Sequence, residues 1–270
     1  MTVPISPVTA PLSTPTSLLP AITVSGNGVM GQLVRKALEA DPTLSFLGCI
    51  GPSTNTPPGL IDYLSFSSLP SVPSGIIDFS HPDCLVEIIE YVMTQLEPGE
   101  NKPGRRIPVV IATTGYSPDQ IDQIHQLASR VPVVFSSNFS PGVTILTRIL
   151  RELAPLMADW DVDIVEKHHR RKVDAPSGTA LTLAKTLNRP LIYGRHGYSP
   201  RKDEIGIHAV RGGDIRGVHE VIFMGNGETL TLTHEALDRG LFAAGAVKAM
   251  KFALEQDGPG LWNMEDVLTK

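Results

Sequence analysis

AITVSGNGVMG, at residues 21–31, is a short run of β-forming residues that passes directly into the glycine pattern Gly26-x-Gly28-x-x-Gly31. Residues 32–40 continue it with a helix-forming composition. In this spacing the first glycine permits a tight turn, the second lets the backbone approach a pyrophosphate, and the third allows close packing of helix on strand. The stretch therefore predicts a phosphate-binding loop, with the phosphates on free N–H groups where the helix begins. A glycine-rich turn of an ordinary α/β fold is the alternative interpretation.

Strand-like and helix-like patterns alternate after this loop. Strands are expected at residues 44–50, 75–80, 108–112 and 132–136, and helices at 84–96 and 118–129. Strands that alternate with helices imply parallel strands joined by right-handed crossovers, and nearly all-apolar runs are typical of strands covered on both faces. We therefore expect an α/β fold that begins with a Rossmann-type parallel sheet.

The order of elements changes after about residue 141. A helix at 143–157, a strand at 162–167 and a helix at 177–187 precede three β-rich runs, at 204–211, 218–224 and 228–234, with no helix between them. This order predicts a second, α+β domain with a mixed or antiparallel sheet. The last helix, about 239–255, is amphipathic and can return to the first domain. The expected boundaries are a tail at 1–20, a dinucleotide-binding domain at 21–141 completed by 239–270, and a substrate domain at 142–238.

Length and charge limit the classes of function. The 270 residues suggest about two domains and a core that needs neither disulfides nor metal. With 23 basic and 28 acidic residues, the formal net charge of −5 argues against nucleic-acid and membrane partners. Cys49 and Cys84 are too few for a disulfide framework, and no apolar run reaches the length of a transmembrane helix. We expect a cytoplasmic location.

The first twenty residues, MTVPISPVTAPLSTPTSLLP, contain five prolines and no lysine or arginine. A signal peptide needs a positive start and an unbroken apolar stretch, and a transit peptide needs arginine, so neither fits. Because proline removes backbone donors and disfavours helix, we expect an extended or disordered, dispensable tail. A docking arm is the alternative function.

One feature of a dinucleotide site is missing from the sequence. The residues that close the second predicted strand, CIGPSTN at 49–55, contain no Asp or Glu to bind the adenosine ribose. Since a carboxylate there would repel a 2′-phosphate, its absence leaves NADPH admissible. No lysine or arginine in this loop favours the phosphate either, unless Arg35, Lys36 or His81 reaches across in space. We expect both NADH and NADPH to serve.

The densest chemistry in the chain is EKHHRRKVDAPSGT, residues 166–179, between a predicted strand and a predicted helix. Adjacent strand residues point to opposite faces, so His168 and His169 serve one site only if the strand ends there and the chain turns. Lys172 follows closely, and the helix start at 177–179 offers backbone donors to a carboxylate. Together these groups can bind an anionic substrate and transfer protons.

Two other interpretations of this cluster exist. A charge run is most often a solvated surface. Two histidines can also bind zinc, but metal-binding helices usually space them as His-x-x-x-His, and no cysteine or third histidine stands nearby in sequence. We expect no metal site.

Residues 166–179 resemble the signature of the 4-hydroxy-tetrahydrodipicolinate reductase (dihydrodipicolinate reductase) family of bacterial lysine biosynthesis. The resemblance covers nearly all of residues 21–250 and includes five shorter motifs: IDFS at 77–80, ATTG at 112–115, SNFS at 137–140, GDI at 213–215 and THEALDR at 233–239. It implies NADH- or NADPH-dependent reduction of 4-hydroxy-tetrahydrodipicolinate to tetrahydrodipicolinate in the diaminopimelate route. It also implies a homotetramer built through the sheet of the second domain.

The resemblance further implies a role for each site residue. Proton transfer is assigned to His168 and Lys172. Substrate binding is assigned to His169, Ser177, Gly178 and Thr179. The cofactor-binding residues that it implies are Gly26, Asn27, Gly28, Val29, Met30, Gly31, Phe79, Ala112, Thr113, Thr114, Ser136, Ser137, Asn138 and Phe139. The missing ribose acid, the tail, and His81 where many relatives carry arginine are departures that bear on cofactor preference, not on the reaction.

In the implied reaction a hydride reaches C4 of an unsaturated six-membered ring that carries two carboxylates, after loss of water. The enamine-like product needs a proton, which Lys172 or His168 can donate while stabilising negative charge. Another two-domain NAD(P)-dependent dehydrogenase, such as an amino-acid dehydrogenase, would share the glycine loop without needing the whole signature. A non-catalytic dinucleotide-binding regulator would have lost its proton-transfer groups, whereas His168, His169 and Lys172 all remain.

Overall fold

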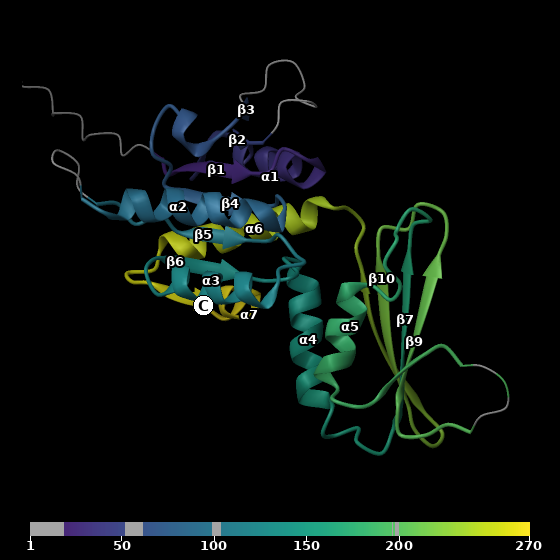
Figure 1. Cartoon of the computed structure of the whole chain (residues 1–270). Coiled ribbons are helices and arrows are strands. Elements are labelled where there is room, and N and C mark those ends of the chain that lie inside the picture. Colours follow the sequence, from purple (N-terminus) through teal and green to yellow (C-terminus); the bar gives the residue numbers. More distant parts are fainter. Residues whose placement is uncertain (1–18, 52–61, 99–103, 196, 198–199) are drawn as a thin grey trace, which may run out of the picture.

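The computed structural model describes residues 19–51, 62–98, 104–195, 197 and 200–270, so the predicted tail lies almost wholly outside the described residues. Two β-sheets make up this part of the chain (Figure 1). The chain passes from the first sheet to the second just before residue 141, and it returns after residue 235. The junction between the sheets is therefore made by two crossing segments.

The first sheet is parallel and has the strand order β12-β6-β5-β4-β1-β2-β3. Its strands are β1 (Ala21–Ser25), β2 (Ser45–Ile50), β3 (Asp62–Tyr63), β4 (Gly75–Asp78), β5 (Val109–Ile111), β6 (Pro132–Phe135) and β12 (Gly260–Trp262). Because β2 and β4 pair with opposite edges of β1, the direction of winding reverses beside β1. Such a reversal opens a crevice at the carboxyl ends of the strands, where dinucleotides bind. The predicted Rossmann-type sheet is confirmed.

Helices cover both faces of this sheet, as the nearly all-apolar strands require. The helices α1 (Val29–Glu39) and α6 (Gly240–Leu254) pack on one face, and α2 (Leu85–Leu96) and α3 (Pro118–Ala128) pack on the other. Alternate residues of one strand serve the two faces: Ile77 packs toward α6, whereas Ile76 packs toward α2 and α3. The late helix α6 brings fully buried Ala246 and Met250 into the core of the early sheet.

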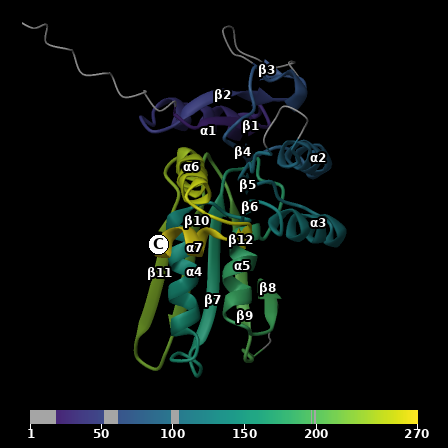
Figure 2. The same cartoon turned by 90° about the vertical axis from the view of Figure 1, so that its left-hand side faces the viewer.

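The second sheet is mixed, with the order β11-β10-β7-β9-β8. Its strands are β7 (Asp161–His168), β8 (Leu191–Tyr193), β9 (Ile205–Arg211), β10 (Val218–Met224) and β11 (Thr229–Glu235). β7, β9 and β8 run parallel, and β10 is antiparallel to both β7 and β11. The helices α4 (Pro141–Leu153) and α5 (Gly178–Thr186) cover one face, as Figure 2 shows. The predicted second fold unit with a mixed sheet is confirmed.

The structure differs from the sequence prediction in short elements and at some ends. The helix α7 (Met264–Thr269) and the strands β3, β8 and β12 were not predicted. Strands of two or three residues are defined by their partners rather than by their own pattern. The predicted strand 75–80 ends at Asp78, and the predicted helix 143–157 spans Pro141–Leu153. Ser140 accepts a hydrogen bond from Val143 N–H, which fixes the earlier start of α4.

Candidate active site

The glycine loop follows β1 at the reversal point of the first sheet. Gly26 has a φ of +97°, a conformation that favours glycine, and its N–H donates to the carbonyl of Ile50 at 2.8 Å. A side chain at Gly31 would overlap the carbonyl of Gly26, so the third glycine lets α1 start directly against the loop. Next to Gly28, by contrast, a Cβ would meet nothing within 4 Å. The three glycines therefore serve the turn, the packing and the open approach that the motif predicts.

The amino end of α1 provides the donors of this loop. Gly28 is its N-cap residue, no side chain caps it, and its first turn contains no acidic residue. The first N–H groups of a helix have no partner within the helix, and the helix dipole favours an anion there. Val29, in this first turn, is an exposed apolar residue with 64% of its surface accessible. These residues fit the pyrophosphate of a dinucleotide.

A carboxylate that the sequence did not place at this loop is present in the structure. Asp62, in β3, accepts a hydrogen bond from the side-chain amide of Asn27 at 3.1 Å. β3 pairs with β2 in register Cys49↔Asp62, so Asp62 reaches the glycine loop from the next strand along the sheet. The expectation of no carboxylate beside this loop is therefore wrong. It was drawn from residues 49–55 alone, and the neighbour in space comes later in the chain.

Two of the three cations considered at this loop, Arg35 and His81, contact other residues. Arg35 pairs with Glu39 at 2.7 Å, and its guanidinium lies over the Phe46 ring. His81 contacts Asp83, and its ring accepts a hydrogen bond from the backbone of that residue, with a side chain that is 71% exposed. The contacts of Arg35 and His81 therefore give no indication that either side chain binds a 2′-phosphate.

The other predicted cofactor residues follow the ends of β4, β5 and β6. Phe79 and Phe139 place their rings 6.1 Å apart, and Thr113 Oγ1 accepts the N–H of Ser80 at 2.8 Å. Ser136 donates to the carbonyl of Asn138 at 2.9 Å, which folds the segment after β6 back on itself. The carboxyl edge of the first sheet thus gathers residues from four predicted motifs on one side of the crevice.

A cavity of about 750 Å³ lies between this edge and the second sheet, a size typical of small-molecule sites. From the first sheet it is lined by Thr114, Ser137 and Asn138, and from the second part of the chain by His168, His169, Lys172, Ser177, Gly178 and Thr179. The structure therefore brings all six residues predicted for catalysis and substrate binding to one cavity. It also places three predicted cofactor residues on the opposite wall.

The charge of the cavity wall is predominantly positive. Among its described lining residues, Lys172, Lys185, Arg216 and Arg239 carry a fixed positive charge, and Asp174 is the one carboxylate. Such a wall attracts anions, and a ring with two carboxylates has the opposite sign of charge. Sequence reasoning did not assign Arg216 or Arg239, although both stand in or beside motifs that carried the resemblance.

The two histidines of the signature occupy different environments. β7 ends at His168 and the chain turns after it, which is the condition under which both histidines can serve one site. His168 is 8% exposed, and its Nδ1 lies 2.5 Å from Glu166 Oε2. His169 lies outside the strand, with its Nε2 3.3 Å from Arg239 Nη2. Burial, together with the charges of Lys172 and Arg211, lowers the pKa of His168 despite the opposing effect of the Glu166 carboxylate.

Lys172 reaches the cavity from the turn after β7. Its ammonium lies 2.7 Å from Asp174 Oδ1. Burial raises the pKa of Asp174, but the hydrogen bond from Lys172 and backbone N–H groups, including that of Gly178, outweigh this and hold it below its usual range. The Asp174 carboxylate therefore lies close to the amino end of α5, where the sequence predicted donors for a carboxylate.

Ser177 and Thr179 have different surroundings at the start of α5. The Ser177 hydroxyl accepts the Ala180 N–H at 3.2 Å and lies 3.1 Å from His219 Nε2, and its own N–H donates to Glu166. Both polar groups of Ser177 are therefore engaged inside the protein. Thr179 Oγ1 accepts a hydrogen bond from Asn138 Nδ2 at 3.0 Å, which joins the segment after β6 directly to α5.

His219 and His234 extend this polar cluster, and sequence reasoning did not assign them either. The ring of His219 meets that of His168 edge-on at 5.2 Å, and His234 Nε2 lies 3.2 Å from the Ser140 hydroxyl. Burial lowers the pKa of His219 to about 4, so this ring is neutral near pH 7. The available signal was a histidine at an inward position of β10, where Val221 and Phe223 form the core.

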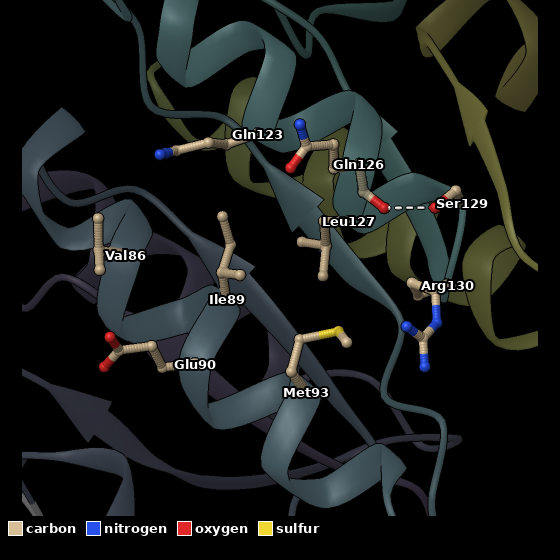
Figure 3. Close-up of a pocket in the computed structure, with 9 residues that line it drawn as sticks. All are labelled: Val86, Ile89, Glu90, Met93, Gln123, Gln126, Leu127, Ser129 and Arg130. Atoms are coloured by element: carbon tan, nitrogen blue, oxygen red, sulfur yellow. Dashed lines mark hydrogen bonds between the residues drawn. The ribbon is translucent and has the colours of Figure 1, made fainter.

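A second hollow, of about 410 Å³, lies between α2 and α3 on the outer side of the first sheet (Figure 3). Ile89 and Met93 face Leu127 across it, and Glu90 and Arg130 are its charged residues. It contains none of the predicted site residues. Within the described residues, no group of three His, Cys, Asp or Glu side chains is arranged to hold a metal ion, and no helix is long and apolar enough to cross a membrane.

Comparison with known families explains the two parts of the chain. A family model described as dihydrodipicolinate reductase, N-terminus, matches residues 21–139, and one described as dihydrodipicolinate reductase, C-terminus, matches residues 142–268. The chain belongs to the dihydrodipicolinate reductase family. The predicted family is confirmed, and with it the prediction of a reductase enzyme.

Individual relatives agree with this membership. The 4-hydroxy-tetrahydrodipicolinate reductase of Caldanaerobacter subterraneus subsp. tengcongensis is 38% identical over 255 residues, covering 90% of this chain and 96% of the relative. The enzyme of the same name from Methanoculleus marisnigri is 38% identical over 261 residues, covering 92% and 98%. The dipicolinate-bound dihydrodipicolinate reductase structure from Paenisporosarcina sp. TG-14 shares the fold, with a TM-score of 0.71 and 24% identity over 92% of this chain and 99% of that one.

Proposed function

We propose that the cavity between the two sheets binds 4-hydroxy-tetrahydrodipicolinate beside a nicotinamide dinucleotide and converts it to tetrahydrodipicolinate in the diaminopimelate route to lysine. The observation that carries this proposal is the two-sided lining of the cavity. Thr114, Ser137 and Asn138 come from the dinucleotide edge, and His168 and Lys172 come from the family signature. Hydride donor and proton donor would thus meet across one ring.

The dinucleotide would lie along the carboxyl ends of β1, β4, β5 and β6, on the cofactor residues named above. The open space at Gly28 and the uncapped start of α1 support a pyrophosphate position there. When bound, the nicotinamide supplies the hydride. Membership of the family implies a nicotinamide dinucleotide as cofactor. We further propose that both NADH and NADPH serve.

The substrate-side residues would have two roles, binding of the ring carboxylates and proton transfer. The two ring carboxylates would bind His169, Thr179 and the amino end of α5, with Ser177 holding that end in place. Lys172 and His168 would stabilise negative charge as it develops on the ring and would return a proton to it. In the structure Lys172 binds Asp174, so the ammonium must share or leave this carboxylate to reach the ring.

The oligomer proposed is a homotetramer formed through the second sheet. Its face opposite α4 and α5 presents Val165, Ile222 and Val210, and no described helix packs on it. The Lys167–Glu220 ion pair, at 3.0 Å, lies on the same face. A half-apolar sheet face of this kind is typical of a surface that another subunit covers. Light scattering of the purified protein tests the proposal, and a monomer at micromolar concentration would contradict it.

The domain division and the location remain proposals as well. We place the dinucleotide domain at 21–141 with 239–270 and the substrate domain at 142–238, which the packing of α6 on the first sheet supports. We place the enzyme in the cytoplasm, where its proposed pathway operates.

The reaction is tested by following the loss of NADH or NADPH absorbance with the product of dihydrodipicolinate synthase as substrate. Oxidation that depends on this substrate is the expected result. An amino-acid dehydrogenase of the same architecture would instead oxidise its cofactor only with its own keto acid and ammonia. A regulator would bind the dinucleotide and oxidise none, so each alternative gives a different outcome.

A further inference from the structure

Glu166 is the most deeply buried charged side chain beside the cavity, and the proposed reaction leaves it without a role. Its carboxylate is 0% exposed on β7, two residues before His168 and therefore on the same face of the sheet. Oε2 lies 2.5 Å from His168 Nδ1 and 2.8 Å from Arg211 Nη1. Oε1 lies 2.6 Å from Arg211 Nη2 and 3.0 Å from the backbone N of Ser177.

These four contacts define the protonation state of the carboxylate. Burial raises the pKa of Glu166, but the hydrogen bonds from Arg211, His168 and the Ser177 N–H outweigh it and lower the pKa below its usual range. A bidentate arginine makes a strong, well-oriented partner for an ionised carboxylate. An ionised carboxylate only accepts hydrogen bonds, so the proton between the two side chains belongs to His168 Nδ1.

The ring of His168 is thereby fixed in one tautomer and one orientation. With Nδ1 donating to Glu166, the neutral ring carries its lone pair on Nε2. That nitrogen lies beside Gly217, where a Cβ would come within 3.0 Å of it, so the glycine leaves room at Nε2. Among the described residues, none is hydrogen-bonded to Nε2, and the ring lines the cavity.

We propose that Glu166, held by Arg211, is a positioning residue that makes His168 Nε2 the nitrogen exchanging a proton with the substrate. This inference rests on the proton-transfer role proposed for His168. The same carboxylate holds the N–H of Ser177 at the start of α5, and Arg211 also donates to the carbonyl of Asp174 at 2.6 Å. One ion pair therefore contacts the imidazole, the substrate-binding helix end and the turn that carries Lys172.

The charged neighbours of the His168 ring determine how its pKa shifts. Glu166 on β7 raises the pKa of His168, whereas Lys172 and Arg211 lower it. His219, packed edge-on from β10, is neutral near pH 7. When the charge of Glu166 is removed, burial, Lys172 and Arg211 remain, and all of them lower the pKa of His168. The limb of the kcat/KM profile that reports His168 is then expected to move to lower pH.

The first test is Glu166→Gln, which keeps the shape of the side chain and loses its charge. An amide can donate to Nδ1, which would move the ring proton to Nε2. We expect kcat to fall by about 10- to 100-fold, the usual effect of a group that orients a reacting side chain. Substrate KM should change by less than about threefold, and the titrating limb should shift to lower pH. Glu166→Asp, which keeps the charge, should restore the position of that limb.

A matched control comes from another arginine–glutamate pair. Glu265 on α7 binds Arg151 on α4 at 2.9 Å, and neither residue lines the cavity. Glu265→Gln should leave the pH profile unchanged. A double-mutant cycle separates positioning from folding: on a His168→Gln background, Glu166→Gln should cost much less activity than it costs in the wild type, because only the contacts through Ser177 and the Asp174 turn remain to be lost. If it costs the same factor on both backgrounds, Glu166 acts only on the fold and the proposal is overturned.

The tautomer can also be observed in the wild-type enzyme itself, without any change at Glu166. In nitrogen spectra of histidine-labelled protein at a pH above its pKa, the His168 ring should carry its proton on Nδ1, with His168→Gln identifying the signals. A proton on Nε2 would overturn the proposal. Failure of the proposed function is distinguishable, since His168→Gln with full kcat would remove the catalytic role of the histidine whatever tautomer is observed.

Discussion

Two surfaces of the molecule would recognise charge by different physical means. One is the carboxyl edge of the first sheet with its glycine loop (the dinucleotide wall), and the other is the cavity lining from the second part of the chain (the substrate wall). On the dinucleotide wall, the described groups that face the phosphate position are backbone N–H groups at the start of α1, with the Asp62 carboxylate beside them at Asn27. On the substrate wall, fixed charges dominate, with Lys172, Arg216 and Arg239 among them. Backbone dipoles are set by the fold and tolerate many side-chain changes, whereas a wall of side-chain cations depends on each residue. Single substitutions should therefore change substrate binding and turnover more than they change dinucleotide binding.

Lys172→Ala is the largest expected effect. The positive charge of Lys172 matters most when negative charge develops on the substrate ring in the transition state. Its removal should therefore lower kcat by roughly 10²–10⁴, the usual range for general acid catalysis. The affinity for NADPH should stay the same, because the dinucleotide is proposed to bind on the other wall. Steady-state kinetics and NADPH titration measure both quantities, and Lys248→Ala, an exposed lysine on α6, is the control. A wild-type kcat would transfer the proton-donor role to His168.

His169→Ala is expected to have a smaller effect of a different kind. His169 is assigned to a ring carboxylate that is present in both ground state and transition state, and loss of such uniform binding raises KM with little change in kcat. Losing a hydrogen bond to a charged group predicts a KM about 10- to 100-fold higher. If kcat falls instead while KM is unchanged, the two histidines share the chemistry and their proposed division is wrong.

The choice of cofactor probes the dinucleotide wall. We expect NADH and NADPH to be used within about tenfold in kcat/KM, which corresponds to about 1.4 kcal/mol. Asp62 now adds a carboxylate beside Asn27, and a carboxylate disfavours a 2′-phosphate. Asp62→Asn should accordingly shift the ratio toward NADPH. Parallel assays with the two cofactors give the ratio, and a preference beyond a hundredfold in the wild type would contradict the expectation.

The smallest effect is expected outside both walls. Residues 1–18 lie outside the described residues, and their sequence offers neither basic residues for phosphate nor apolar periodicity for packing. Deleting residues 2–17 should leave kcat, KM and Tm nearly unchanged. Thermal unfolding of the shortened chain measures this, and a large fall in Tm would show that the segment is docked.

Local patterns were sufficient for the parts of the molecule that are local in sequence. The glycine spacing after β1 and the signature that starts within β7 predicted both walls, because each is a strand, a loop and a helix in immediate succession. The pairing of Asp62 with Asn27 joins residues 35 positions apart, and the contact of Arg239 with His169 joins residues 70 apart. Such contacts are set by sheet order, which a pattern along the chain does not specify.

Glu166 shows a second limit of pattern reading. In sequence it is one more charge in a run of charges, for which a solvated surface is the usual interpretation. In the structure it is fully buried and paired with Arg211, which stands opposite His168 in the parallel register of β7 and β9. The burial follows from strand alternation, but the partner follows from the neighbouring strand. A charge at an inward strand position is therefore the signal to look for.

The placement of α6 has a consequence for synthesis of the chain. The face of the first sheet that carries Ile22 and Val110 is covered by Ala246 and Met250, and β12 closes its edge beside β6. Both elements leave the ribosome after all the strands of the second sheet. Domains usually fold in the order in which they are made. When the second sheet has all its strands and helices, the first sheet still lacks α6, which covers one of its faces together with α1, and its edge strand β12. The nucleotide-binding half therefore begins first and is completed last.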